Sequence, residues 1–326
     1  MFSFPVSRIS TAIVVWLMMA SHLMVSAAEF SAQKIDNTLY LGNMLTTDKA
    51  DDWQSRFWGL AYGNWDHRQI DTNVTGFRAD TFGLIAGLHR KRNSRLTWGW
   101  SAGGSWISAN NDANSGYKNI DGFKTMFDAA LDSKDWRLIT CAGFGYNSQS
   151  IQRHDYYGVF SGENNAQQWG VGTEFQLKVN SGPFEMEPYA RFDVMTLSEK
   201  GYTEHRISGI GLPQSFGKTS DESIATTLGV RYRWRQTGHL AVWRPELTAA
   251  WCHEFGSDDL FRSSRLDPFP TFYTFPGSNN QRDHLLFGFG IVAHFGSTMD
   301  LFARYTTDIA GDYTANTIHV GTNWKF

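Results

Sequence analysis

The chain has 326 residues, a formal net charge of −3 and two cysteines, which exclude a nucleic-acid-binding charge pattern and a disulfide scaffold. Its length allows one large domain or two ordinary ones. A mean hydropathy of −0.36, with 15% aromatic residues and 31 glycines, indicates an all-β protein in which apolar residues alternate with polar ones.

The first 28 residues have the pattern of a secretory signal peptide. Arg8 supplies a positive charge, residues 12–20 form an apolar run, and Ser26-Ala27-Ala28 places small residues before Glu29. We therefore expect cleavage near Ala28 and export of the rest of the chain. No later stretch is apolar for long enough to predict a membrane-spanning helix.

Residues 29–55 form a short leader before the predicted β-domain. Ile35, Leu39 and Tyr40 would share one face of a helix, so this leader is either a short pore helix or a disordered segment, and the sequence leaves both open. The leader is too short for an exported cargo, so we expect none in this chain.

From residue 56 to residue 326 the chain alternates with a period of two, which is the pattern of β-strands. Short turns are expected at residues 92–94, 133–135, 180–182, 237–238 and 296–297, and they alternate with long polar stretches near residues 66–76, 109–118, 150–166, 198–221 and 256–283. Transmembrane barrels alternate short periplasmic turns with long extracellular loops in this way. The pattern predicts a transmembrane antiparallel β-barrel of about twelve strands, of outer-membrane type.

Charged residues recur on the strand face opposite the aromatic residues. A charge facing lipid costs about 2–4 kcal/mol at mid-membrane, so these residues are predicted to line the lumen. They are Glu174, Glu185, Glu187, Arg191, Asp193, Arg231, Arg233 and Arg304. Both signs are present, so no ion selectivity follows. A girdle of aromatic residues is expected near the periplasmic strand ends: Trp58, Trp98, Trp136, Trp234, Trp243, Trp324 and Phe326.

Several segments resemble one family of secreted-protein barrels. Residues 244–255 resemble the P-E-L-x-x-x-W/Y-x-H-E-F stretch of autotransporter β-domains, and residues 187–204 and 228–232 resemble its P-Y-A, G-F/Y-x-E and L-G-x-R segments. Residues 321–326 resemble the terminal signature that the barrel assembly machinery reads, which makes Trp324 and Phe326 the expected assembly signal. The resemblance covers residues 56–326 and implies a twelve-stranded translocator barrel of type V secretion, with a helix threading the pore.

Enzymatic motifs are weak. Residues 99–103 match G-x-S-x-G, but they continue a strand, whereas a nucleophile elbow needs a strand-to-helix turn. The G-x-G pairs at Gly143, Gly170 and Gly288 lack the helix start of a dinucleotide site and are expected to face the lumen. We predict no catalytic, metal-binding or cofactor-binding residues, and two free thiols at Cys141 and Cys252, because their strands lie too far apart around the barrel for a bridge.

Acid–histidine neighbours are expected near the extracellular strand ends. They are Asp66-His67, His154-Asp155, Glu204-His205, His253-Glu254 and Asp283-His284. A histidine and a carboxylate can activate water, so a surface hydrolase of protease type is one alternative function. Adjacent residues on a strand point to opposite faces, however, so the interpretation we favour is a solvated polar rim.

The sequence thus predicts a non-enzymatic outer-membrane barrel, either a translocator and anchor or a partly plugged passive pore. A third class, an adhesion or recognition barrel, is suggested by the aromatic loop at residues 258–282, which would equally serve as a lid. The expected partners are outer-membrane lipid and the barrel assembly machinery, with no nucleic acid, and the expected state is a monomer. The sequence names no passenger, solute or host partner.

Overall fold

The computed structural model describes residues 54–69, 76–111, 116–255, 261–276 and 282–326. The predicted signal peptide and most of the predicted leader lie outside the described residues. The first described strand begins at Ser55. No helix in the described part of the chain is long and apolar enough to cross a membrane.

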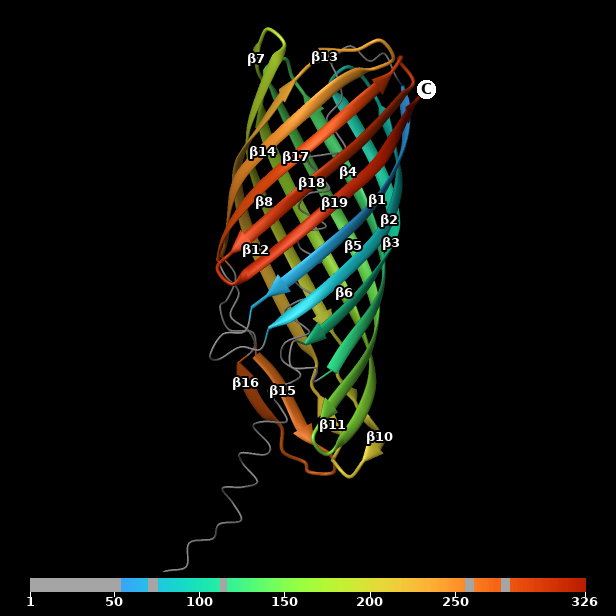
Figure 1. Ribbon diagram of the computed structural model, residues 1–326, viewed down its shortest axis with the longest axis vertical. Helices are drawn as coiled ribbons and strands as arrows, with labels where there is room; N and C mark the ends of the chain where they lie inside the picture. The colour runs from blue at the N-terminus through green and yellow to red at the C-terminus, as the bar shows by residue number, and fades with distance from the viewer. Residues whose placement is uncertain (1–53, 70–75, 112–115, 256–260, 277–281) are drawn as a thin grey trace, which may run out of the picture.

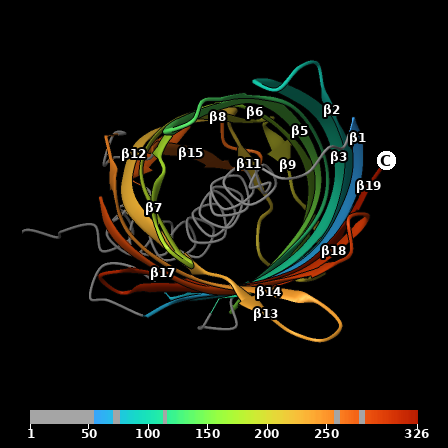
Figure 2. The same ribbon diagram turned by 90° about the horizontal axis from the view of Figure 1, so that it is seen from above.

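Twelve strands of the described chain form a closed antiparallel barrel, as predicted (Figures 1 and 2). Each strand pairs with the next barrel strand along the chain, and the first pairs with the last, from Arg56–Lys325 to Arg68–Tyr313. The barrel strands are β1 (Ser55–Arg68), β2 (Phe77–Lys91), β3 (Leu96–Asn111), β4 (Gly116–Asp132), β5 (Trp136–Asp155), β6 (Gly158–Leu177), β8 (Phe184–Glu199), β12 (Thr219–Trp234), β14 (Val242–Glu254), β17 (Asp283–Phe295), β18 (Met299–Ala310) and β19 (Tyr313–Lys325).

The alternation of residue types explains why these segments are strands of a barrel. Along β2 every second residue is buried, and the residues between them are exposed on the outside, where Phe82, Leu84 and Leu88 are 50%, 47% and 50% exposed. An outward apolar surface of this kind fits lipid. Closure also pairs the backbone groups of every strand, which hydrocarbon requires.

The two ends of the barrel differ. At one end, which we call the short-turn end, the C-terminus lies beside the connections that join β2 to β3 and β17 to β18 (Figure 1). Two further short strands lie there: β7 (Val179–Ser181) pairs with β8, and β13 (Gln236–Thr237) pairs with β14. In bacterial barrels the short turns face the periplasm, so the opposite, long-loop end corresponds to the cell exterior.

Three predicted connections differ from the structure. Residues 150–166 were expected to form a long loop, but β5 continues to Asp155 and β6 begins at Gly158. The predicted loop at residues 109–118 is largely strand, because β3 ends at Asn111 and β4 begins at Gly116. Between Ala310 and Tyr313 the chain makes a tight turn, so short and long connections do not alternate strictly.

The remaining strands form a cap at the long-loop end. A four-stranded sheet, in the order β16-β15-β11-β9, combines two connections: the one between β8 and β12, and the one between β14 and β17. Another strand from the first of these connections, β10, pairs with the start of β6. The cap strands are β9 (Tyr202–Thr203), β10 (His205–Gly209), β11 (Gln214–Phe216), β15 (Phe261–Leu266) and β16 (Tyr273–Pro276).

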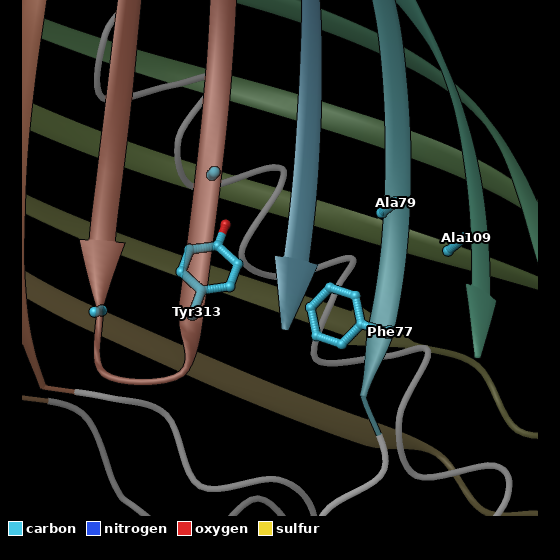
Figure 3. Packing of buried hydrophobic residues seen from close by; sticks show 6 residues of the cluster. Phe77, Ala79, Ala109 and Tyr313 are labelled. Atoms are coloured by element: carbon cyan, nitrogen blue, oxygen red, sulfur yellow. The ribbon is translucent and has the colours of Figure 1, made fainter. Parts of the chain in front are cut away.

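Apolar side chains inside the barrel gather in small clusters near each end. Near the long-loop end, Phe77 and Tyr313 pack with four alanines, of which Ala79 and Ala109 are labelled in Figure 3. Nearer the short-turn end, Trp58, Tyr62 and Ile85 pack together with Leu60. Most of the remaining inward positions are polar or charged, so the interior is a lumen with polar walls.

Candidate functional site in the lumen

Buried charges of both signs occupy adjoining strands on one side of the lumen. Glu174 lies on β6, Glu187 on β8, Arg231 and Arg233 on β12, and Glu246 on β14, and each is at most 5% exposed. Because β8 pairs with β12 at Arg231–Glu187, and β12 pairs with β14 at Arg233–Glu246, alternate residues of three strands converge on one patch.

Arg231 reaches across β8 to Glu174. Its two terminal nitrogens donate to the two carboxylate oxygens at 2.7 and 3.1 Å, a bidentate geometry that fixes both side chains. Gln176 donates a further hydrogen bond to Glu174 at 2.6 Å. The guanidinium also lies over the ring of Tyr189, with its central carbon 3.9 Å from the ring centroid. The Glu174 carboxylate is thus fully partnered although it is 1% exposed.

Arg233 and Glu246 continue this network toward β18. Arg233 contacts Glu187 at 2.6 Å and Glu246 at 2.5 Å, and Arg304 of β18 donates to the other oxygen of Glu246. Nearby, Arg244 pairs with Glu185 at 2.6 Å. Alternating charges therefore link β6, β8, β12, β14 and β18. We name the set Glu174, Glu187, Arg231, Arg233, Glu246 and Arg304 the charge ladder.

Arg191 and Asp193 pair with each other on β8, and Arg191 lies opposite Glu174 in the register between β6 and β8. With them, all eight residues predicted to line the lumen lie on the inward face, although Glu185 and Asp193 are more open than the rest. The pairings themselves could not be read from the sequence, because Arg231 bypasses the glutamate directly opposite it in the register.

Glycines leave space for a cavity in the lumen wall beside the charge ladder. Gly143 and Gly170 face each other across β5 and β6, and Gly172 lies opposite Cys141. With Lys124 they line a cavity of about 70 Å³, which also touches Arg191 and Asp193. Both thiols are free, as predicted: Cys141 faces this cavity, and Cys252 is buried on β14. No group of three or more possible metal ligands occurs among the described residues.

A second polar group lies opposite the charge ladder, and the sequence did not predict it. His89 Nδ1 lies 2.9 Å from a terminal nitrogen of Arg56, and its Nε2 lies 2.9 Å from Asp128. An arginine can only donate, so Nδ1 is the acceptor and the Nε2 proton points at Asp128. Trp58 stacks on His89, with ring centroids 5.9 Å apart. Trp58 is 0% exposed inside the barrel, so its predicted place in an outer aromatic girdle was wrong.

Other members of the predicted girdle do face outward near the short-turn end. Trp98 is 48% exposed, Trp243 is 40% exposed, and Trp324 is 42% exposed and stacked on Phe57. The terminal Phe326 is 69% exposed. These side chains border the outward apolar band, where amphipathic rings meet the headgroups of a bilayer.

The histidines of the acid–histidine neighbours on β14 and β17 lie on opposite faces of the barrel wall. His253 pairs with Asp283 at 2.9 Å on the outside of the barrel, whereas His284 pairs with Asp308 at 3.0 Å on the inside. The side chain of Asp283 is 64% exposed, so the outer pair is open to solvent. Because the barrel wall separates the two pairs, they cannot act on one substrate.

A third group of buried polar residues fixes the cap to the barrel wall. Arg153 of β5 donates twice to Glu204, at 3.0 and 2.7 Å, and also contacts Asp155, while its guanidinium lies over the ring of Phe160. Arg153 is 1% exposed and Glu204 4% exposed. The connection between β8 and β12 is therefore fastened to the hairpin that β5 and β6 form.

The described part of the loop at residues 258–282 lies in the cap. Strands β15 and β16 pair with each other, and β15 pairs with β11. Phe269, Phe272 and Tyr273 are 57%, 47% and 50% exposed.

A closed twelve-stranded barrel with an outward apolar band and a charged lumen defines a transmembrane β-barrel protein. Residues 57–306 match the autotransporter β-domain family. The chain belongs to this family.

The similar proteins agree with this assignment. An extracellular serine protease from Serratia marcescens is 24% identical over 302 residues, which cover 87% of this chain and 27% of that protein. This chain thus spans about a quarter of the length of that relative. The translocator domain of the autotransporter NalP from Neisseria meningitidis superposes with a TM-score of 0.73 at 17% identity, over 94% of this chain and 100% of that domain. The β-domain of the Bordetella autotransporter BrkA gives a TM-score of 0.65 at 17% identity, over 84% of this chain and 100% of that domain. At these identities the two structures show the shared fold.

Proposed function

We propose that this chain is the outer-membrane translocator and anchor of an autotransporter system, and that it has no enzymatic activity of its own. The observation that carries the proposal is the closed barrel, in which β1 and β19 pair along their whole lengths around a polar lumen. Closure creates a path through the bilayer that is lined by charged and polar groups. Membership of the autotransporter β-domain family supports the same role.

The protein would reach the outer membrane of a Gram-negative cell by way of the predicted signal peptide. Its terminal strand would then be recognised by the barrel assembly machinery. Trp324 and Phe326 suit this recognition because both are exposed on the outer surface at the short-turn end. The barrel would stand as a monomer in contact with lipid.

Accessible epitope tags test the translocator role in whole cells. One tag is inserted between Glu29 and Phe30 of the full chain. Two reference tags mark the sides of the membrane: one between Tyr156 and Tyr157 in the turn after β5, and one between His239 and Leu240 at the short-turn end. If the barrel carries its preceding segment outward, antibody labels the first tag on intact cells to the same extent as the tag at Tyr156.

A first tag that is labelled only after the outer membrane is permeabilised, like the tag at His239, would refute translocation. The barrel would then be a passive pore. Conductance of the full mature chain in a planar bilayer separates the remaining cases, because an open pore gives a large steady current and a plugged one does not. Heat-modifiable migration in gels confirms that each tagged barrel has assembled.

A further inference from the structure

An unusual concentration of positive charge lies at the short-turn end. Residues 90–95, at the end of β2 and in the turn that follows it, read Arg-Lys-Arg-Asn-Ser-Arg, with four basic residues and no acidic one, in a chain whose formal net charge is −3. Arg90, Arg92 and Arg95 are exposed. No carboxylate within the described residues pairs with any of these three arginines.

The backbone of this turn is fixed by several hydrogen bonds. The side-chain oxygen of Asn93 accepts from the backbone nitrogens of Arg95 at 2.9 Å and Leu96 at 2.8 Å. The backbone nitrogen of Asp132 donates to the carbonyl of Arg95 at 2.7 Å, which ties the turn to the end of β4. The backbone that carries the three arginines therefore has a fixed position relative to the barrel.

The cations border the surface that faces lipid. Arg90 lies directly opposite Trp98 in the register between β2 and β3, and the next outward pair into the membrane is Leu88 with Trp100. Leu88, Trp98 and Trp100 are 50%, 48% and 43% exposed on the outside. Tryptophan at such a border marks the level of the headgroups, so the guanidinium of Arg90 is at the height of lipid phosphates.

We propose that Arg90, Arg92 and Arg95 bind the headgroup of an anionic phospholipid in the periplasmic leaflet. A guanidinium presents paired donors that match the oxygens of a phosphate, and Leu88 and Trp98 offer an apolar surface for the acyl chain beside it. The continuity of the cations with the lipid-facing band favours a lipid over an acidic periplasmic protein. Other short-turn connections lack this feature: residues 296–298, for example, carry no charge.

Native mass spectrometry of the full mature chain in detergent, with equimolar phosphatidylglycerol and phosphatidylcholine, tests the site. The wild type should retain more phosphatidylglycerol, and the triple variant Arg90→Gln, Arg92→Gln, Arg95→Gln should lower the ratio of the two bound lipids at least tenfold, since each basic residue near the surface contributes about fivefold. The triple Arg→Lys variant keeps the charge and should retain most of the preference.

A variant with Arg78→Gln, Lys200→Gln and Lys218→Gln removes the same charge from the opposite end and should leave the ratio unchanged. The proposal is overturned if the Gln variant at the turn keeps the wild-type ratio, or if the control variant lowers the ratio equally. If the triple variant fails to fold, Arg90→Gln against Arg78→Gln decides in the same way. A turn that instead captures an acidic protein would show no lipid preference in this assay.

Discussion

Replacing Arg231 by Met tests whether the charge ladder lies in a dry or a wet part of the lumen. The substitution preserves much of the aliphatic length but removes both hydrogen bonds to Glu174, which is 1% exposed and would keep only the 2.6 Å bond from Gln176. Breaking a buried ion pair by removing one partner costs about 3–5 kcal/mol. In a lumen filled with water the same loss would cost about 0–1 kcal/mol.

Equilibrium unfolding by guanidinium chloride in detergent micelles, followed by tryptophan fluorescence, measures this free energy. We expect Arg231→Met to lower the free energy of unfolding by about 3–5 kcal/mol. The double variant Arg231→Met with Glu174→Met should recover most of this loss, because apolar replacement of both partners is often neutral. Arg244→Met is the matched control: its partner Glu185 is 25% exposed, so its loss should stay near 1 kcal/mol. A loss below about 1 kcal/mol for Arg231→Met, or strictly additive effects in the double variant, would refute the reasoning.

Three further results are expected. Gly87→Ala should destabilise the barrel by about 1–3 kcal/mol in the same unfolding assay, because a Cβ there would lie 2.6 Å from the Trp58 ring and 2.8 Å from Ser101, whereas Gly59→Ala, with nothing within 4 Å, should change little. Thiol titration of the denatured, unreduced protein should find two thiols per chain, and a count of zero would contradict the separate positions of Cys141 and Cys252. Arg153→Met should speed protease cleavage between residues 200 and 218 while the heat-modifiable barrel persists, and unchanged cleavage would show that the contact with Glu204 does not hold the cap.

The barrel could be predicted because lipid imposes a rule that sequence records directly. Within the membrane, outward positions must be apolar and inward ones are free to be charged, so the alternation around Arg231 and Arg233 indicates both strand and face. Outside the bilayer, outward positions need not be apolar. The outward residues Ser148, Ser150 and Gln152 at the end of β5 are polar, which is the composition of a loop, although they still pair with β6 as a strand.

Faces and pairings beyond nearest neighbours were harder to infer. In β1 aromatic residues occupy both faces, so the pattern did not show that Trp58 points inward while Phe57 and Trp65 point outward. The contact between Arg56, His89 and Asp128 joins three strands, and it exists only once the register is set. The sequence of a single strand does not predict such a group.

The unequal strand lengths give the mouth of the barrel a slanted rim. Strands β5 and β6 have 20 residues each, while β17, β18 and β19 have 13, 12 and 13 (Figure 1). At about 3.3 Å per residue, seven extra residues add roughly 23 Å along the strand. A polypeptide leaving the lumen would therefore pass a tall hairpin, β5 and β6, on one side, whereas the wall that β17, β18 and β19 form on the other side ends lower. The unequal walls would bias its direction of exit toward the lower side.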